Sequence, residues 1–441
     1  MSGRLKQLLC FGASVLDARD WTNTGWVLGE RVLRLVGGLV VGTWVARHLG
    51  PVGYGVISHA LAVTGTFALL LHFGMDVALL RDLAREPERK RVVLSTHLVI
   101  RAAGGMLALG GVQILAALAG AGRDLWAAAT IMSVAMLWRV GEIWEIADNA
   151  ERNQRRPALV RIVATVVGAA VKAALIACDA PLWAFGAAAG LDMALTGIVF
   201  AGVALRRGGF RVGEVSFSYA WSLRGEMAWA MLAALCMLVL SRLDQICLGF
   251  VGAEKDMGGY AAAVRLVEAG QLIPMSMLAA LAPALFAPGA RDAHALNRAA
   301  GRLQRQVGSV AFGGALLLTL FAAPLVRLLY GADYAGAGAL LRGYAWVGFA
   351  TVVLSINSRW LYARNLGRLN CAFLVVGALV AVFANALLVP RWHAMGALTA
   401  TLAGMFATSF VAPVLFSEGR PLAKLWWTSL VRTHRMETRW E

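Results

Sequence analysis

The chain alternates between long apolar runs and short segments that are rich in Gly, Pro and charged residues. Most apolar runs are about 20 residues long and do not alternate between apolar and polar positions. A helix of that length crosses the ~30 Å hydrocarbon core of a bilayer, whereas a membrane β-barrel would show alternating segments of ~10 residues. The pattern therefore predicts an all-α polytopic membrane protein with about 12 transmembrane helices. The predicted spans are residues 25–46, 54–75, 92–118, 125–147, 158–178, 182–204, 227–250, 259–287, 308–329, 338–362, 370–389 and 394–416.

Composition excludes a soluble globular fold. The 441 residues are 59% hydrophobic and only 15% charged, with a mean hydropathy of +0.67, whereas a soluble chain carries ~25% charged residues. The sequence contains no nucleotide-binding loop, no metalloprotease motif and no clustered Cys and His, so neither an enzyme nor a metal or cofactor site is expected. The cysteines are scattered and are interpreted as small apolar residues; they are Cys10, Cys178, Cys236, Cys247 and Cys371.

The basic residues between the spans predict the orientation. If the N-terminus is cytoplasmic, the inside segments hold 27 of the 41 Lys and Arg residues, and the outside loops hold four. Cytoplasmic loops of membrane proteins carry such an excess, so both termini are predicted to be cytoplasmic. This bias accounts for the net charge of +16 without nucleic-acid binding. The four outside residues are Arg47, Arg123, Lys255 and Arg391.

Two stretches of the chain resemble each other and predict two lobes. Residues 25–75 and 227–287 each contain a span, a Gly-rich corner and a second span, with Tyr54 and Tyr260 at matching positions. Six spans separate the copies, so both halves enter the membrane from the same side, which predicts parallel repeats and a transporter. The predicted organisation is an interfacial segment at 1–24, an N-lobe at 25–204, a linker at 205–226, a C-lobe at 227–416 and a cytoplasmic tail at 417–441.

Charged residues within the spans are the candidate functional residues, because a charge at mid-bilayer usually faces a cavity or a partner. Three local pairs are expected from helical spacing: Glu30 with Arg34, Arg139 with Glu142, and Arg265 with Glu268. By contrast, no acidic residue lies three or four positions from Arg101, Lys172 or Arg242. Asp244 is only two positions from Arg242, so the two side chains are expected to point in different directions.

Cations without a local partner imply an anion that the protein itself does not supply. Arg is suited to phosphate because its planar guanidinium makes bidentate hydrogen bonds. We therefore predict a cationic cavity that binds a phosphate, a diphosphate or an acidic sugar. Its predicted residues are Arg34, Arg101, Lys172 and Arg242, with Arg31, Arg139 and Arg265 as either further cavity residues or members of structural pairs. Glu30, Asp244 and Glu268 are predicted either to bind coupling protons or to serve as fixed counter-ions.

Several stretches carry a family resemblance. They are "WVARHLGPVGYGVIS" (44–58), "SRLDQICLGF" (241–250), "GGYAAAVRLVE" (258–268), "IPMSMLAALAPAL" (273–285), "LLYGADYAGAGALL" (328–341) and "NALLVPRWHAMGALTATL" (385–402). In this order they resemble bacterial polysaccharide-biosynthesis flippases of the O-antigen type. These belong to the multidrug/oligosaccharidyl-lipid/polysaccharide exporter superfamily, which has the MATE-like fold. Asp244 and Tyr260 match the pattern of that family's seventh and eighth helices.

The resemblance implies a flippase for an undecaprenyl-diphosphate-linked oligosaccharide in the bacterial inner membrane. It further implies alternating access between two lobes, coupling to an ion gradient, a cationic lumen, and a role in making lipopolysaccharide O-antigen, capsule or exopolysaccharide. A polysaccharide polymerase and glycosyltransferases are the implied protein partners. Three alternatives stay open: a MATE-type drug or cation antiporter, a flippase for the peptidoglycan lipid precursor, and a non-transporting scaffold of a glycan-assembly complex.

Overall fold

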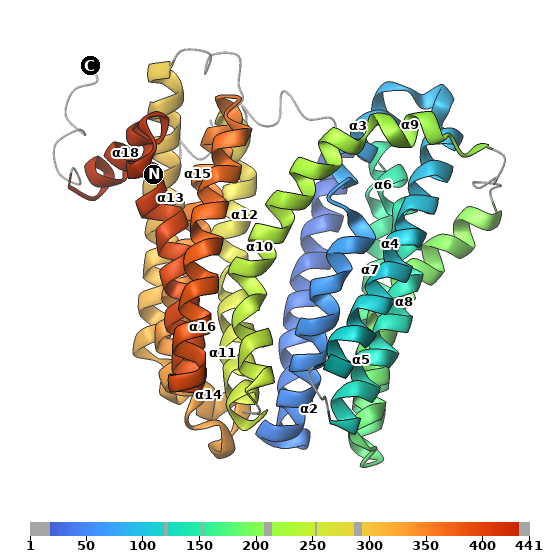
Figure 1. Cartoon of the computed structure of the whole chain (residues 1–441), viewed down its shortest axis with the longest axis vertical. Helices are drawn as coiled ribbons and strands as arrows, with labels where there is room; N and C mark the ends of the chain where they lie inside the picture. Colours follow the sequence, from blue (N-terminus) through green and yellow to red (C-terminus); the bar gives the residue numbers. More distant parts are fainter. Residues whose placement is uncertain are drawn as a thin grey trace. The chain divides into compact units, whose positions relative to one another are not determined.

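The computed structural model describes residues 18–118, 122–151, 153–206, 214–251, 254–285 and 293–431. Every regular element in these ranges is a helix, which confirms the predicted all-α class (Figure 1). The chain forms two compact units. Unit 1 comprises Met1–Gly42 and Phe67–Met227, and unit 2 comprises Thr43–Thr66 and Ala228–Glu441. The division at Met227 lies at the end of the predicted linker, but the structure groups residues 43–66 with the second unit rather than with the first.

Helix α2 (Ala18–His72) and helix α10 (Arg224–Phe250) each contribute to both units. The remaining elements of unit 1 are α3 (Asp76–Arg85), η1 (Pro87–Arg89), α4 (Lys90–Leu118), α5 (Arg123–Met136), η2 (Leu137–Glu142), α6 (Ile143–Ala150), α7 (Arg155–Ala177), α8 (Leu182–Arg206) and α9 (Phe217–Ser222). Those of unit 2 are α11 (Glu254–Gly270), α12 (Leu272–Leu281), η4 (Ala282–Leu285), α13 (Ala293–Leu320), α14 (Ala322–Tyr330), η6 (Ala332–Tyr334), α15 (Ala337–Ala363), α16 (Gly367–Phe406), η7 (Ala407–Val411), α17 (Ala412–Leu415), η8 (Ser417–Gly419) and α18 (Arg420–Val431).

Among the described residues, eight helices are long and apolar enough to cross a membrane, and a bent pair formed by α13 and α14 makes a ninth. Two of the eight are 48 and 49 residues long, about twice the length that a bilayer requires. Each contains one residue with non-helical backbone angles, Gly50 in α2 and His393 in α16, so each is two spans joined by a corner. With α5–η2–α6 as a further crossing, the arrangement agrees with about 12 spans.

Gly50 and Gly377 illustrate how the corners and hairpins are built. Gly50 has a φ of 66°, a conformation that glycine adopts without steric cost, so the corner predicted in "HLGPVGYG" is confirmed as a break between helices. In the second hairpin, a Cβ added at Gly377 would lie 1.6 Å from the Thr408 hydroxyl oxygen. The two arms of that hairpin therefore fold back against each other at a distance that only glycine allows.

The two Gly-rich corners pack against each other within unit 2. A Cβ added at Gly55 would lie 2.0 Å from the carbonyl oxygen of Glu254, and one added at Gly258 would lie 1.9 Å from that of Pro51. Each glycine thus accepts the backbone of the opposite corner. This reciprocal contact explains why residues 43–66 belong to unit 2.

Arg47 and Tyr334 attach the first corner further to unit 2. The guanidinium of Arg47 donates to the carbonyl oxygens of Leu328 and Leu329, at 2.7 Å in the case of Leu329, in the last turn of α14. Carbonyl groups in the last turn of a helix lack an intrahelical partner, so Arg47 satisfies them. The Tyr334 hydroxyl donates to the carbonyl oxygen of Ala46 at 2.8 Å.

Part of the predicted linker is anchored to unit 1 through α9. The Tyr219 hydroxyl donates to Asp82 at 2.6 Å and lies 3.3 Å from the His97 ring. Burial by itself raises the pKa of Asp82, but hydrogen bonds from Arg81 and Tyr219 outweigh burial and hold this pKa below its usual value. The carboxylate of Asp82 is therefore charged at neutral pH and fixes the linker helix.

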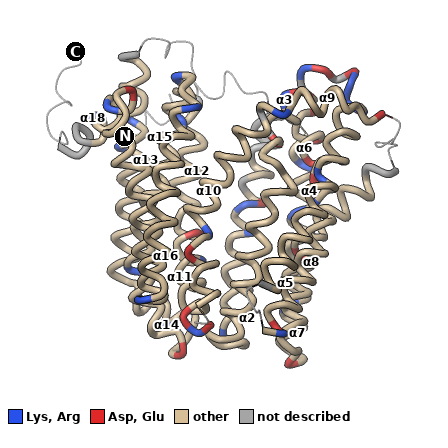
Figure 2. Tube along the Cα trace, viewed as in Figure 1, with Lys and Arg blue, Asp and Glu red and all other residues tan. Residues whose placement is uncertain are grey.

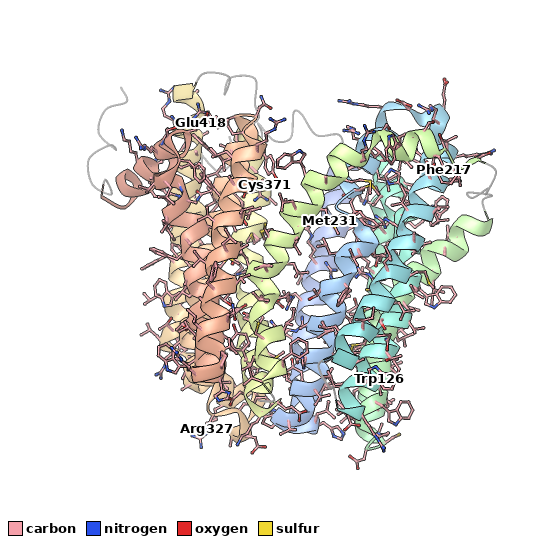
Figure 3. All side chains as sticks on the ribbon, viewed as in Figure 1. Trp126, Phe217, Met231, Arg327, Cys371 and Glu418 are labelled. Carbon is pink, nitrogen blue, oxygen red and sulfur yellow. The ribbon has the colours of Figure 1, made fainter. Side chains whose placement is uncertain are left out.

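Exposed aromatic side chains mark the ends of unit 1. Phe217 is 83% exposed and Trp126 is 51% exposed, and they lie at opposite ends of the unit (Figure 3). Aromatic side chains are enriched at both membrane–water interfaces, so these two fit the depth expected for interface anchors. Residues 1–17 of the predicted interfacial segment, 207–213 of the linker and 432–441 of the tail lie outside the described residues.

Candidate functional site

Few charged residues interrupt the apolar helices. In Figure 2 the Lys, Arg, Asp and Glu positions concentrate at helix ends, and the middle of the helices is mostly uncharged. A charged side chain in the middle of a span is costly unless it faces water or a partner. The charged groups that do lie within the spans therefore define the candidate site in each unit.

In unit 1, the part of α2 within the first predicted span (25–46) carries three charged side chains on adjacent turns. Glu30 is 3% exposed, and its carboxylate lies 3.0 Å from the guanidinium of Arg34, which confirms the predicted local pair. Arg34 is itself 53% exposed. Arg31 is exposed and forms no ion pair with any residue that the structure describes. Residues 25–46 of α2 thus present two exposed guanidinium groups against one buried carboxylate.

The break between α5 and α6 supplies a second set of charges in unit 1. Arg139 makes a bidentate contact with Glu142 at 3.0 and 3.1 Å, as its spacing predicted. Both residues belong to the 3-10 segment η2, and such a segment within a helix often marks a functional hinge. Glu145 pairs with Arg161 of α7 at 2.6 Å.

Glu145 lies close enough to Glu142 and Glu30 to interact with both electrostatically, so these charges form one group. Within this group the three carboxylates of Glu30, Glu142 and Glu145 are balanced by the three guanidinium groups of Arg34, Arg139 and Arg161. Arg31 remains as the excess positive charge. The group draws its members from α2, η2, α6 and α7, and the Thr196 hydroxyl of α8 lies 3.4 Å from Glu142.

Three predicted cavity residues have acidic partners that helical spacing did not reveal. Arg101 contacts Asp76 and Lys172 contacts Asp192, and Arg242 lies 3.0 Å from Glu268. The premise that these cations lack a protein partner is therefore wrong. The reason is that each partner is on a neighbouring helix, 20 to 26 positions away along the chain.

In unit 2, Glu268 serves two guanidinium groups at once. Its carboxylate lies 3.0 Å from Arg242 on α10 and 3.4 Å from Arg265 on α11, the latter a predicted local pair. The Arg265 side chain is 56% exposed, and it lies close enough to Tyr54 to interact with it electrostatically. Since two cations share one carboxylate, this trio keeps one uncompensated positive charge in the middle of its helices.

Asp244 has a different environment from the other acidic residues. It is 1% exposed and accepts hydrogen bonds from the Tyr260 hydroxyl, from Thr401 at 2.9 Å and from the Gln245 backbone N–H at 2.7 Å. It forms no ion pair with any described cation, and Arg242 contacts Glu268 instead, so the two side chains have different partners, as their spacing predicted. A buried carboxylate is costly as an anion unless hydrogen bonds or a cation compensate it.

The residues that the sequence missed differ in how well they could have been found. Lys172 and Asp192 lie on consecutive spans, eight residues before and twelve residues after Ala180 in the turn between them. Aligning the two arms of that hairpin could therefore have suggested the pair. No comparable signal existed for Thr401, which is 157 positions from Asp244. No group of three or more His, Cys, Asp or Glu able to hold a metal occurs in the part of the chain that the structure describes.

The fold is shared with solved transporters. The chain resembles the lipid II flippase MurJ in an inward closed conformation, with a TM-score of 0.64 and 14% identity over 93% of this chain and 91% of that chain. It also resembles an inward-facing MATE-family multidrug resistance transporter of the MOP superfamily (TM-score 0.60, 17% identity, 93% and 96% covered). A MOP superfamily transporter from Pyrococcus furiosus, described by the reverse polarity of its binding pocket, gives a TM-score of 0.57 at 15% identity, with 90% and 94% covered. Identities this low establish the fold and not the function.

The family assignment rests on the sequence itself. No curated protein sequence matches the chain. The model of the family described as "Polysaccharide biosynthesis protein", however, matches residues 44–338, which is about two thirds of the chain and includes the corner at Gly50 and the Arg242–Glu268–Arg265 trio. The chain therefore belongs to the polysaccharide biosynthesis protein family, with the helical membrane fold that lipid flippases and MATE transporters share.

Proposed function

We propose that the protein is a flippase that moves an undecaprenyl-diphosphate-linked oligosaccharide across the bacterial inner membrane by alternating access. The oligosaccharide would serve surface polysaccharide synthesis as O-antigen, capsule or exopolysaccharide. Family membership supports a role in polysaccharide synthesis. The lipid II flippase MurJ has a similar fold, which supports transport of a lipid-linked substrate. The observation that carries the proposal is the excess of exposed guanidinium groups within the spans of each unit.

A diphosphate headgroup fits these guanidinium groups chemically. Arg242 and Arg265 share one carboxylate, so either can bind a phosphate oxygen while the other keeps its ion pair. Arg31 and Arg34 offer the same excess in unit 1. Arg–phosphate contacts are bidentate and strong in a low-dielectric site.

The three remaining cavity predictions take a modified form in this proposal. Arg101, Lys172 and Arg139 each have a carboxylate partner. We therefore expect a diphosphate to compete with that carboxylate for each cation. When a diphosphate replaces the carboxylate beside one of these cations, the local charge changes by a full unit. Substitution of these three residues should therefore change the transport rate more than the affinity of the resting protein for the substrate.

Ion coupling is assigned to Asp244 in preference to Glu30 and Glu268. Glu30 and Glu268 each lie beside an arginine, which favours a fixed counter-ion role. The hydrogen-bond donors to Asp244 are all neutral, so uptake of a proton or a small cation would remove an unfavourable buried charge. We propose both termini to be cytoplasmic, and a polysaccharide polymerase and glycosyltransferases to act beside the protein.

The experiment is a complementation test with a charge-matched control. A deletion strain would carry the wild-type chain, the Arg242→Gln/Arg265→Gln variant, or the Arg327→Gln/Arg342→Gln variant, which removes two exposed arginines elsewhere in unit 2. The first variant should lose surface polysaccharide and accumulate the lipid-linked oligosaccharide on the cytoplasmic side. The second should not, because Arg327 and Arg342 lie near the ends of their predicted spans, where a long side chain reaches the interface. Export that survives deletion would overturn the proposal, as would full export by the first variant.

The same strains separate the alternatives. A non-transporting scaffold should tolerate neutral substitutions at the trio as long as the protein is present in the membrane at wild-type amounts. A drug antiporter should change resistance to cationic compounds and leave the glycan unchanged. A flippase for the peptidoglycan precursor should affect growth and cell shape rather than surface polysaccharide alone.

A further inference from the structure

One end of unit 2 carries a dense set of basic side chains. They lie at the N-terminal end of α13, at the turn between α15 and α16, and on α18, and all of them are exposed. Glu418, just before α18, marks this end in Figure 3, and Arg327 in α14 marks the opposite end. The basic residues are Arg298, Arg302, Arg305, Arg364, Arg368, Arg420 and Lys424.

No acidic side chain that the structure describes neutralises the six arginines of this set. None of them forms an ion pair with an acidic residue in the part of the chain that the structure describes. Two have aromatic partners instead: Arg364 lies 4.8 Å from the centre of the Trp360 ring, and Arg368 lies 6.0 Å from that of Trp229. This cation–π contact fixes the guanidinium without cancelling its charge.

The arginines of α13 occupy one face of the helix. Arg298, Arg302 and Arg305 follow the spacing i, i+4, i+7, which places them on one side. The opposite face, with Ala300, Leu303 and Val307, is buried in the core of unit 2. The basic stripe is therefore directed away from the protein by the packing of the helix itself.

Further along α13 the same face becomes apolar and stays exposed. Phe312 and Leu316 continue the spacing of Arg298 and Arg305 and are 46% and 42% exposed. α13 has 28 residues, or ~42 Å at 1.5 Å per residue, against a hydrocarbon core of ~30 Å. If the apolar part lies in the hydrocarbon, the ~12 Å excess carries Arg298 beyond it, and the long side chains of Arg302 and Arg305 reach from the core boundary to the depth of the headgroup phosphates.

α18 completes this surface and is held firmly. The indole N–H of Trp426 donates to Asn357 at 2.9 Å, and Trp426 is 8% exposed. Leu425 lies 3.8 Å from a Cβ added at Gly301, between the arginines of α13. α18 therefore packs against α13 beside the basic stripe. The exposed Arg420 and Lys424 of α18 add two basic side chains to the stripe.

We propose that the basic surface of α13 and α18 binds the headgroup phosphates of anionic glycerophospholipids in the adjacent leaflet. This α13–α18 surface comprises Arg298, Arg302, Arg305, Arg420 and Lys424. The exposed apolar face of the same helix favours this ligand, because a phospholipid contacts the arginines with its phosphate and the apolar face with its acyl chains, whereas a nucleic acid or a soluble acidic protein would contact the arginines alone. The guanidinium groups can bind the phosphate of a phospholipid, and the exposed Phe312 and Leu316 can contact its acyl chains. The proposal does not depend on the transported substrate.

The test measures lipid binding to the full-length protein purified in a mild detergent. Native mass spectrometry would count phosphatidylglycerol and phosphatidylcholine bound to the wild type and to Arg298→Gln/Arg302→Gln/Arg305→Gln. The control is Arg327→Gln/Arg342→Gln/Arg391→Gln, which removes the same charge from three exposed arginines outside the surface. The wild type and the control should retain phosphatidylglycerol in preference to phosphatidylcholine, and the first triple variant should bind phosphatidylglycerol roughly tenfold more weakly.

Equal losses in both triple variants would overturn the proposal, because they would show an effect of net charge alone. Unchanged binding in the first variant would overturn it as well. Should that variant fail to fold, the single variant Arg302→Gln replaces it, with an expected loss of a few fold against Arg342→Gln. No glycan lipid is present in this assay, so its outcome is independent of the complementation test for transport.

Discussion

The pair between Arg101 and Asp76 predicts an asymmetric response to mutation. Only 2% of the Arg101 side chain is exposed, whereas half of the Asp76 side chain is. One guanidinium nitrogen of Arg101, Nη1, is buried and has no hydrogen-bond partner among the residues that the structure describes. Asp76 therefore supplies the only charge compensation that the structure describes for this buried cation, while Asp76 itself can be solvated by water.

The magnitudes follow from this difference in exposure. Asp76→Asn leaves a buried guanidinium without a counter-charge, which costs ~3–5 kcal/mol. Arg101→Met removes the buried charge, fills similar volume and leaves a carboxylate that water can solvate, at a cost of ~1 kcal/mol. The double variant should resemble Arg101→Met, because no buried charge then remains.

The measurement is thermal unfolding in detergent, followed by intrinsic fluorescence of the 15 tryptophans. For a unit of this size, each kcal/mol lowers Tm by ~2–4 °C. Asp76→Asn should therefore lower Tm by roughly 6–20 °C, and Arg101→Met by roughly 2–4 °C. A loss for Arg101→Met equal to or larger than that for Asp76→Asn would refute the reasoning. A mild effect of Asp76→Asn combined with lost transport in Arg101→Met would instead assign Arg101 to the substrate.

Three further predictions follow from contacts elsewhere. Gly258→Val should prevent stable folding, since its side chain would overlap a carbonyl oxygen of the facing corner, whereas Gly313→Ala should be tolerated because nothing described lies within 4 Å of it. Lys172→Met should destabilise by ~2 kcal/mol or more through the unpaired Asp192, and adding Asp192→Leu should restore the stability. The pKa of Asp82 is lower in the folded chain than in the unfolded chain, so its stabilising contribution is complete at neutral pH and is lost as the pH falls through the ordinary Asp pKa of ~3.9 and below it.

Each of these has a direct measurement. In size-exclusion chromatography, Gly258→Val should elute as aggregate and Gly313→Ala as a monodisperse species. Similar profiles for the two variants would contradict the contact between the corners. Thermal unfolding of the single and double variants at Lys172 should show recovery, and transport that stays lost despite recovery would assign the lysine to the substrate. Across the acidic pH range, the Tm of Asp82→Asn should fall less steeply with decreasing pH than the Tm of the wild type. An equal dependence of Tm on pH in the two proteins would contradict a charged, stabilising carboxylate at that position.

The sequence by itself determined the class of the protein, the corners and the local ion pairs. Apolar runs of bilayer length permit only helices in lipid, because every backbone polar group must be satisfied within its own segment. The pairs Glu30–Arg34, Arg139–Glu142 and Arg265–Glu268 form as spaced, since the helical period makes positions three and four apart neighbours in any surroundings. The family resemblance was likewise readable, and the family model matches residues 44–338, which contain most of the stretches that carry the resemblance.

Only the tertiary structure decided which charges are compensated and where the first corner belongs. The partners of Arg101 and Arg242 lie on other helices, and which residues meet there depends on the rotation of each helix about its axis and on the register of its neighbours. A uniformly apolar helix carries little information about that rotation, because lipid and protein neighbours are equally apolar. For the same reason, the placement of residues 43–66 in unit 2 rests on glycine contacts and the Arg47 cap that no spacing along the chain encodes.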